Sequence, residues 1–133
     1  MKFETIRQKA LLKASPCEVC QAYVDPLKQT EVTGSEASGS PMVGGRFTAW
    51  DGNISGKYLE LEEGRKIVHD WKTTEWPKGY PASLVEITVT KKGGGTQLEM
   101  VHSKVPAEQA DDYAEGWEEY YWKPLKKYFA KRE

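Results

Sequence analysis

The sequence predicts an α+β domain in which a curved antiparallel sheet is covered by one long C-terminal helix. Strand-like segments separated by short turns follow one another from residue 46 to residue 104. After them, residues 106–129 show helical periodicity, and residues 114–129 contain six of the fifteen aromatic side chains. A helix so rich in rings, placed after many strands, is typical of a helix packed into the hollow of a sheet.

The composition is that of one ordinary globular domain. The chain has 133 residues, of which 29% are charged and 38% hydrophobic, and its formal net charge is −1. We therefore expect a single domain over 1–133 that needs no disulfide or metal to hold its core. Near-neutral charge argues against nucleic acid as a partner. No stretch approaches the roughly 18 apolar residues of a membrane span. The N-terminus lacks the apolar core of a signal peptide, so we expect a cytoplasmic protein, and a monomer.

The first third of the chain is expected to form a strand and two short helices. Residues 3–13 alternate as a strand does, with Ile6, Ala10 and Leu12 on one face. Ser15 can cap a helix over 15–25, and a second short helical turn over PLKQT follows it. The small, polar stretch GSEASGSPMVGG is expected to be a loop or a weak edge strand.

Five further strands are expected between Arg46 and Lys104. The segments are RFTAWD, NISGKYLELEE, RKIVHDWKTTEW, SLVEITVTKK and TQLEMVHSK. Short glycine-containing turns separate most of them, and this predicts antiparallel pairing of successive strands. In the last two segments one face carries the alternating residues Val85, Ile87, Val89, Leu98, Met100 and His102.

Pro106 is expected to open the long C-terminal helix, which has acidic residues near its start and basic residues near its end. On a helical wheel its apolar side is about 200° wide, against the roughly 100° that suits a flat sheet. The helix should therefore lie in a trough. Pro124 lies inside it and should kink it near Tyr120, as a hinge for ligand entry or as a static bend. The interior below the rings is either fully packed or contains a pocket.

Four segments of this chain resemble a known family. They are Gly44-Gly45-Arg46-Phe47, residues 51–79, residues 96–106 and residues 116–129, in that order. Together they resemble the C-terminal domain of the activators of the heat-shock-protein-90 ATPase, which belong to the START-like (SRPBCC) superfamily. The resemblance covers nearly the whole chain. It implies the helix-grip (START/Bet v 1-like) fold, in which a curved sheet of six or seven antiparallel strands grips the long C-terminal helix, with two short helices after the first strand.

The resemblance implies three candidate functions. The first is a non-enzymatic START-like domain that binds a hydrophobic small molecule or lipid in a cavity between sheet and C-terminal helix. The second is a co-chaperone-like module of the stress response that binds heat shock protein 90 and modulates its ATPase. The third is an enzyme of the polyketide cyclase type. Full-length eukaryotic activators carry a separate N-terminal chaperone-binding domain, for which these 133 residues leave no room, so co-chaperone activity does not transfer directly.

The expected lining of the cavity consists of inward-facing strand residues and residues of the aromatic helix: Trp71, Val85, Ile87, Leu98, Met100, His102, Trp117, Glu118, Tyr121 and Leu125. For His102 the alternative is a packing role. Glu118 falls inside the apolar arc, where it would be paired or have a raised pKa, unless it reaches solvent at the edge. Trp76, in a loop before a proline, is a candidate contact with a partner.

No catalytic group, cofactor or metal is expected. His69 and His102 are the only histidines, and neither comes with the grouped carboxylates or thiols that a metal site requires. His69 and Asp70 are adjacent in a strand and face opposite ways, so they do not form a dyad. Cys17 and Cys20 form a C-x-x-C pair near a helix N-terminus. They are either a redox pair or a packed Cys20 beside a partly exposed Cys17.

Overall fold

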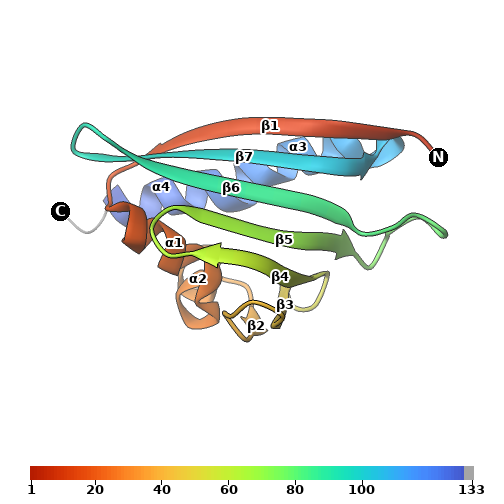
Figure 1. Ribbon diagram of the computed structural model, residues 1–133, viewed down its shortest axis with the longest axis horizontal. Coiled ribbons are helices and arrows are strands. Elements are labelled where there is room, and N and C mark those ends of the chain that lie inside the picture. The colour runs from red at the N-terminus through yellow and green to blue at the C-terminus, as the bar shows by residue number, and fades with distance from the viewer. Residues whose placement is uncertain (131–133) are drawn as a thin grey trace.

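Seven strands form one antiparallel sheet in the computed structural model, which describes residues 1–130 (Figure 1). Their order across the sheet is β1-β7-β6-β5-β4-β3-β2, so the first strand pairs with the last one in the sequence. Successive strands from β2 to β7 are neighbours, as their short connections predicted. The strands are β1 (Phe3–Leu12), β2 (Ser38–Gly39), β3 (Arg46–Ala49), β4 (Ile54–Glu62), β5 (Lys66–Thr73), β6 (Ser83–Lys92) and β7 (Gly95–Pro106).

The two short helices after the first strand are present. They are α1 (Pro16–Val24) and α2 (Pro26–Thr33). Ser15 caps α1 in a capping box, because its hydroxyl accepts from the Glu18 N–H while the Glu18 carboxylate accepts from the Ser15 N–H. Asp25 caps α2 through the N–H of Leu27. The stretch expected as a loop or weak edge strand contributes only the two-residue strand β2.

The C-terminal helix begins later than the sequence suggested. Pro106 does not open it but ends β7, because β1 continues to pair with β7 as far as Phe3 opposite Pro106. A 3₁₀ turn over Ala107–Gln109 (η1) then leads into α3 (Ala110–Trp117). In Figure 1 this helix lies behind β1, β7 and β6 and covers one face of the sheet.

A π-helical segment precedes Pro124, where the sequence predicted a kink. Helix α3 continues into η2 (Glu118–Trp122), and α4 (Lys123–Ala130) follows. The Lys123 N–H donates to the carbonyl of Glu118, five residues earlier, and Pro124 has no N–H to donate. The helix thus widens by one residue immediately before the proline.

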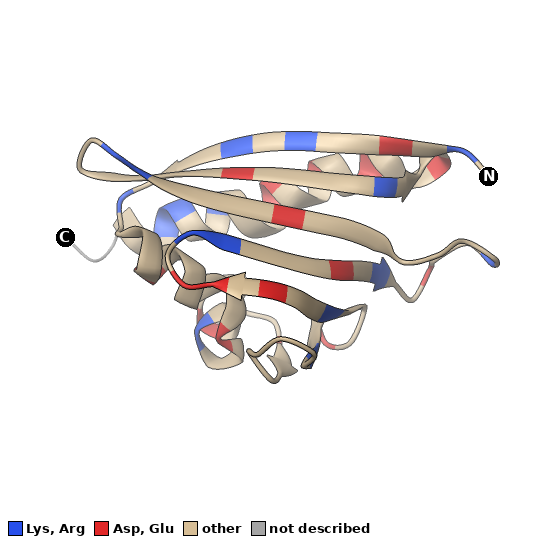
Figure 2. Ribbon diagram, in the orientation of Figure 1, with Lys and Arg blue, Asp and Glu red and all other residues tan. Residues whose placement is uncertain are grey.

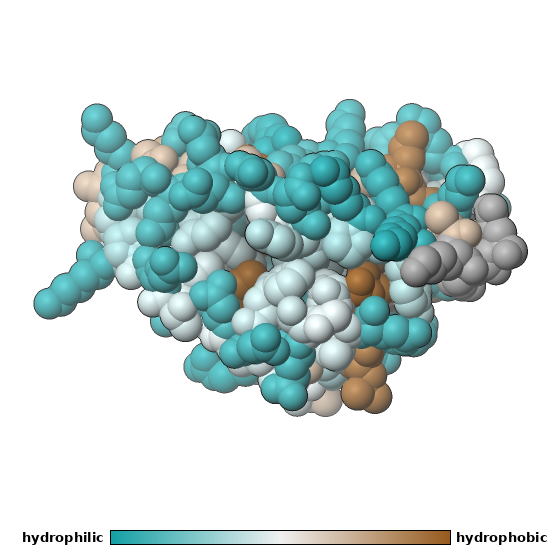
Figure 3. All heavy atoms as spheres, turned by 180° about the vertical axis from the view of Figure 1, so that it is seen from behind, coloured by the Kyte–Doolittle hydropathy of each residue, from teal (hydrophilic) through white to brown (hydrophobic). Residues whose placement is uncertain are grey.

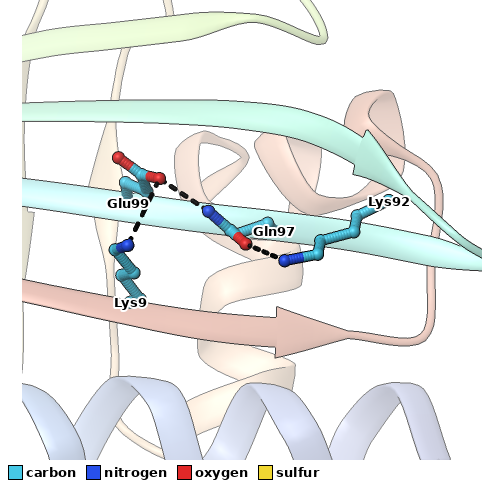
Figure 4. Close-up of polar contacts among 4 residues, drawn as sticks. All are labelled: Lys9, Lys92, Gln97 and Glu99. Carbon is cyan, nitrogen blue, oxygen red and sulfur yellow. Dashed lines mark hydrogen bonds and ion pairs between the residues drawn. The ribbon is translucent and has the colours of Figure 1, made fainter.

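The core lies between the sheet and the helices, and the other face of the sheet is polar. Both acidic and basic residues are distributed along the strands of the sheet (Figure 2). Figure 4 shows one chain of contacts there, in which Lys9 pairs with Glu99 at 4.0 Å, Gln97 donates to Glu99 and Lys92 donates to Gln97. A sheet with one solvated face explains the alternating pattern of its strands. The architecture is the helix-grip fold.

Candidate functional site

A cleft of about 270 Å³ opens between the C-terminal helix and the ends of β4 and β5. Six of its lining side chains are aromatic. The full lining is Trp50, Asn53, Ile54, Trp71, Thr73, Asp112, Tyr113, Gly116, Trp117, Tyr120 and Tyr121. Figure 3 shows the helix side of the molecule, where residues of intermediate hydropathy, the class of tryptophan and tyrosine, occupy the centre and hydrophilic residues surround them.

One face of the helix forms one wall of the cleft. Tyr113, Gly116, Trp117, Tyr120 and Tyr121 follow the spacing of three and four residues that places side chains on a single helical face. Gly116 has no side chain, and a Cβ added there would meet only the Tyr120 ring, at 3.7 Å. The glycine therefore keeps the middle of this wall open.

The opposite wall comes from the sheet and from the turn after β3. Trp71 and Thr73 lie at the end of β5, and Ile54 begins β4. Trp50 lies in the turn with a positive φ of 54°, which explains why the strand expected over 46–51 stops at Ala49. The Trp50 ring meets the exposed Tyr120 ring edge to face, with 5.2 Å between centroids, at the mouth of the cleft.

Three of the ten residues expected to line the cavity are in the wall: Trp71, Trp117 and Tyr121. Most of the others are buried in the packed core and do not line the cleft, namely Val85, Ile87, Leu98, Met100, His102 and Leu125. The cleft lies beside β4 and β5, whereas elsewhere the helix bonds to β7 through Trp117 and His102 and to β1 through Trp122 and Gln8. Glu118 is half-buried and also lies outside the wall.

His102 is a packing residue whose two ring nitrogens are both used. The Ser83 hydroxyl donates to the carbonyl of Trp71 at 2.7 Å, so the contact of 2.8 Å between Ser83 Oγ and His102 Nε2 has the imidazole as donor. Nδ1 then accepts from the Trp117 indole N–H at 3.0 Å. Burial lowers the pKa of His102 to about 3, so the neutral ring is the form that holds Trp117 in place.

His69 is satisfied in the same way, by partners that the sequence did not indicate. Its Nδ1 lies 2.7 Å from the Asp70 carbonyl and therefore carries the proton, so Nε2 accepts from the Tyr23 hydroxyl at 2.9 Å. Burial lowers the pKa of His69 to about 4. The Asp70 carboxylate instead accepts from the Lys57 N–H, so no His–Asp dyad forms.

Trp71 carries an unpaired donor. It is only 3% exposed, and its Nε1–H has no hydrogen-bond partner among residues 1–130. Beside it, the Thr73 and Tyr113 hydroxyls lie 2.9 Å apart, and Tyr113 donates onward to Gln109 at 2.7 Å. The bond between Thr73 and Tyr113 ties the start of the helix to the end of β5.

Trp76, the candidate contact with a partner, does not line the cleft. It is half-buried, its indole N–H donates to the Pro81 carbonyl at 3.1 Å, and its ring stacks on Tyr113.

The two cysteines are both free. Cys17 is exposed and Cys20 is buried, and burial raises the pKa of the Cys20 thiol. Residues 1–130 contain no group of acidic, histidine or cysteine side chains that could hold a metal.

Most of the wall was not foreseen from the sequence. Tyr113, Gly116 and Tyr120 share the helical spacing of Trp117, so that spacing could have found them. Trp50 had no such signal, because its position depends on the backbone of a turn. The remaining unforeseen lining residues are Asn53, Ile54, Thr73 and Asp112.

Comparisons with known proteins agree with the expected family. A family model described as activator of Hsp90 ATPase homolog 1-like protein matches residues 13–130. The human protein "Activator of 90 kDa heat shock protein ATPase homolog 1" is 30% identical over 124 residues, which are 93% of this chain and 36% of that protein. A Dictyostelium discoideum homologue of the activator is 30% identical over 86% of this chain and 30% of its own length. The chain thus spans about a third of the curated relatives it matches.

Solved structures give the same result for the fold. The crystal structure of an HSP90 activator from Plasmodium falciparum is 25% identical with a TM-score of 0.78, and the match covers 85% of this chain and 86% of that one. A protein from Mesorhizobium loti, 21% identical, matches 98% of this chain and 99% of its own with a TM-score of 0.82, which shows likeness of fold alone. Within residues 1–130, none of the helices has the length and apolar character needed to cross a membrane.

Proposed function

Since the chain belongs to the family of activator of Hsp90 ATPase homolog 1-like proteins, we propose that it is a non-enzymatic module that binds a hydrophobic small molecule or lipid in its aromatic cleft. The observation that carries the proposal is the cleft itself, about 270 Å³ in volume with six aromatic side chains in its lining. A concave apolar site with a few polar groups is the usual form of a small-molecule site.

The state of the two histidines supports a binding role over a catalytic one. Both rings are buried, and each uses both nitrogens in hydrogen bonds within the core. Neither histidine lines the cleft. A general base must reach the proton that it removes, and neither ring is placed to do so.

A substitution that fills the cleft tests the proposal. In Gly116→Leu, a leucine side chain would enter the open middle of the helical wall, where only the Tyr120 ring lies within 4 Å of the added Cβ. We expect wild-type protein to bind naphthalene as an apolar probe in a fluorescence titration and the variant to lose at least tenfold in affinity. Ala130→Leu, an exposed change at the end of the same helix, is the matched control and should bind like wild type.

Two results would contradict the proposal. One is an absence of naphthalene binding to folded wild-type protein. The other is equal binding by wild type and Gly116→Leu, which would place the apolar probe elsewhere on the molecule. Circular dichroism of each variant shows whether it is folded.

A second candidate function is a contact with an Hsp90 chaperone. It is favoured by the names of the human relative and of the Plasmodium falciparum structure, both activators of Hsp90. Because the match spans 36% of the human protein, activation by this segment alone is a separate question from binding. The test is the ATPase rate of the host's own Hsp90 with the chain in excess, together with a pull-down. The candidate would be refuted if the ATPase rate stayed unchanged and Hsp90 did not co-purify with the chain.

A further inference from the structure

We propose that the ligand of the aromatic cleft is a small organic cation, in which a substituted ammonium group is attached to an apolar body. This inference rests on the proposed binding function and names the chemistry of the ligand. Three features of the molecule carry it: the charge of the cleft lining, the acidic composition of the helix beside it, and the rings that solvent reaches at its mouth.

The lining of the cleft is negatively charged. Asp112 contributes a carboxylate, and none of the described residues that line the cleft is lysine, arginine or histidine. Burial raises the pKa of the Tyr113 hydroxyl, the hydrogen bond with Thr73 opposes this, and the charges of Glu75 and Asp112 raise the pKa further. Two carboxylates therefore act on one wall of the cleft. An anionic ligand would lose water on entry and be repelled, whereas a cation would be attracted.

The helix beside the cleft is acidic along this wall. Residues 110–122, which make up α3 and η2, contain no lysine, arginine or histidine. The positive end of the helix dipole is worth about half an elementary charge, and the two aspartates of the first turn exceed it. Lys123, one residue further on, pairs with Glu119 at 2.6 Å. The acidic residues of the segment are Asp111, Asp112, Glu115, Glu118 and Glu119.

The rings at the mouth of the cleft can meet a cation directly. Trp50 is half-buried, and Tyr120 is 57% exposed. An ammonium group within about 6 Å of the face of such a ring is attracted to it, most strongly by tryptophan. Asp112 is exposed as well, so we place the ammonium group at the mouth and the apolar body deeper in the cleft. The deeper rings are no more than 5% exposed: Trp71, Trp117 and Tyr121.

The dimensions of the cleft suit a small ligand. Its volume of about 270 Å³ lies below the range of roughly 300–1,000 Å³ that is typical of sites for drug-sized ligands. Asp112, Gly116 and Tyr120 follow one another at intervals of four residues, so they lie along one side of the helix. The rise over eight helical residues is about 12 Å. A molecule of one ring and one ammonium group fits between the carboxylate and the exposed ring, over the open space at Gly116.

A matched set of probes tests the inference by displacement of naphthalene. Benzyltrimethylammonium is a cation, neopentylbenzene is its neutral isostere with carbon in place of nitrogen, and benzylsulfonate is an anion on a similar frame. The ammonium is better hydrated than its isostere, so a purely apolar cleft would prefer neopentylbenzene. We expect wild-type protein to bind benzyltrimethylammonium about fivefold more tightly than neopentylbenzene, as one contact between a cation and a ring allows, and benzylsulfonate most weakly.

Asp112→Asn is the informative variant, and Asp111→Asn is its matched control. Both remove one carboxylate from the first turn of the helix, but Asp111 does not line the cleft. Asp112→Asn should reduce the preference for the cation over its neutral isostere about threefold, and Asp111→Asn should change it by less than about twofold. The preference should also decline between low salt and about 0.5 M sodium chloride, because salt screens an exposed carboxylate.

A second readout locates the charge of the bound probe. In nuclear Overhauser spectra of wild-type protein, the N-methyl protons of benzyltrimethylammonium should contact ring protons of Trp50 or Tyr120. Tyr120→Leu keeps an apolar side chain and removes the ring, so it should lower the affinity for the cation more than the affinity for neopentylbenzene. N-methyl protons that contact neither ring would overturn the inference.

The outcomes separate this inference from the proposed function. If naphthalene binds and neopentylbenzene binds at least as tightly as benzyltrimethylammonium, the inference is overturned and the proposed function stays intact. Tightest binding of benzylsulfonate, or equal effects of Asp112→Asn and Asp111→Asn, would also overturn the inference. If neither naphthalene nor any of the benzyl probes binds, both the inference and the proposed function fail.

Discussion

Lowering the pH should destabilise this fold. The slope of the unfolding free energy against pH should report how many histidines are buried in the neutral form. Burial lowers the pKa of His69 to about 4 and that of His102 to about 3, from an ordinary value of 6.5. Between those values and 6.5 the unfolded chain binds protons that the folded protein does not. The free energy of unfolding therefore rises with pH in this window and falls as the pH drops below 6.5.

The size of the effect follows from proton counting. Between pH 5 and pH 6 an unfolded histidine binds most of one proton, and folded His69 and His102 bind almost none. Each should then contribute about 1.2 kcal/mol per pH unit, and the pair about 2.4 kcal/mol per pH unit. This window lies above the ordinary pKa values of aspartate and glutamate, roughly 3.9 and 4.3, so carboxylates contribute little.

Urea unfolding at several pH values from 5 to 7.5 measures the slope. His102→Gln and His69→Gln each remove one titrating ring, and each should reduce the slope to about half, whatever the variant's stability at pH 7.5. Comparison with wild type cancels any contribution from other groups. A slope near zero, or an unchanged slope in both variants, would refute the assignment of two neutral packing histidines. It would also reopen a catalytic role for them.

Three further predictions concern single positions. Ser15→Ala, which removes the cap of α1, should cost about 1 kcal/mol in urea unfolding, and an unchanged midpoint would contradict the capping role. Gly56→Ala should cost more than about 1 kcal/mol, as overpacking usually does, because its Cβ would lie 2.2 Å from the Asp70 carbonyl oxygen. Gly94→Ala, with open space around it, should change stability by less than about 0.5 kcal/mol; equal losses would refute the steric argument. In native protein iodoacetamide should alkylate the exposed Cys17 and spare the buried Cys20. Mass spectrometry of the labelled peptides measures this, and alkylation of Cys20 with Cys17 unmodified would contradict it.

The order of elements could be predicted because local signals determine it. Alternation gave the strands from β4 to β7, Ser15 marked the start of α1, and the spacing of rings identified the long helix. The boundary at Pro106 was wrong because a contact with Phe3, about a hundred residues earlier, extends β7. Long-range pairing of this kind leaves no local pattern.

The cleft was harder to predict than the fold. An inward-facing residue such as Met100 has the same pattern whether it packs against a neighbour or lines a space, and here it packs. The role of His102 depends on Ser83 and Trp117, which come from other elements. The sequence therefore located the helix and sheet that enclose the cleft, and only the three-dimensional structure showed which of their residues line it.

The central claim, that the aromatic cleft holds a small molecule, is tested most directly by native mass spectrometry of the protein purified from its own host. Wild type and Gly116→Leu should be compared, with bound material released into organic solvent and identified. The account predicts that a defined hydrophobic compound accompanies wild type and is absent from Gly116→Leu. Wild-type protein that carries no small molecule and takes up none of the aromatic probes would contradict it.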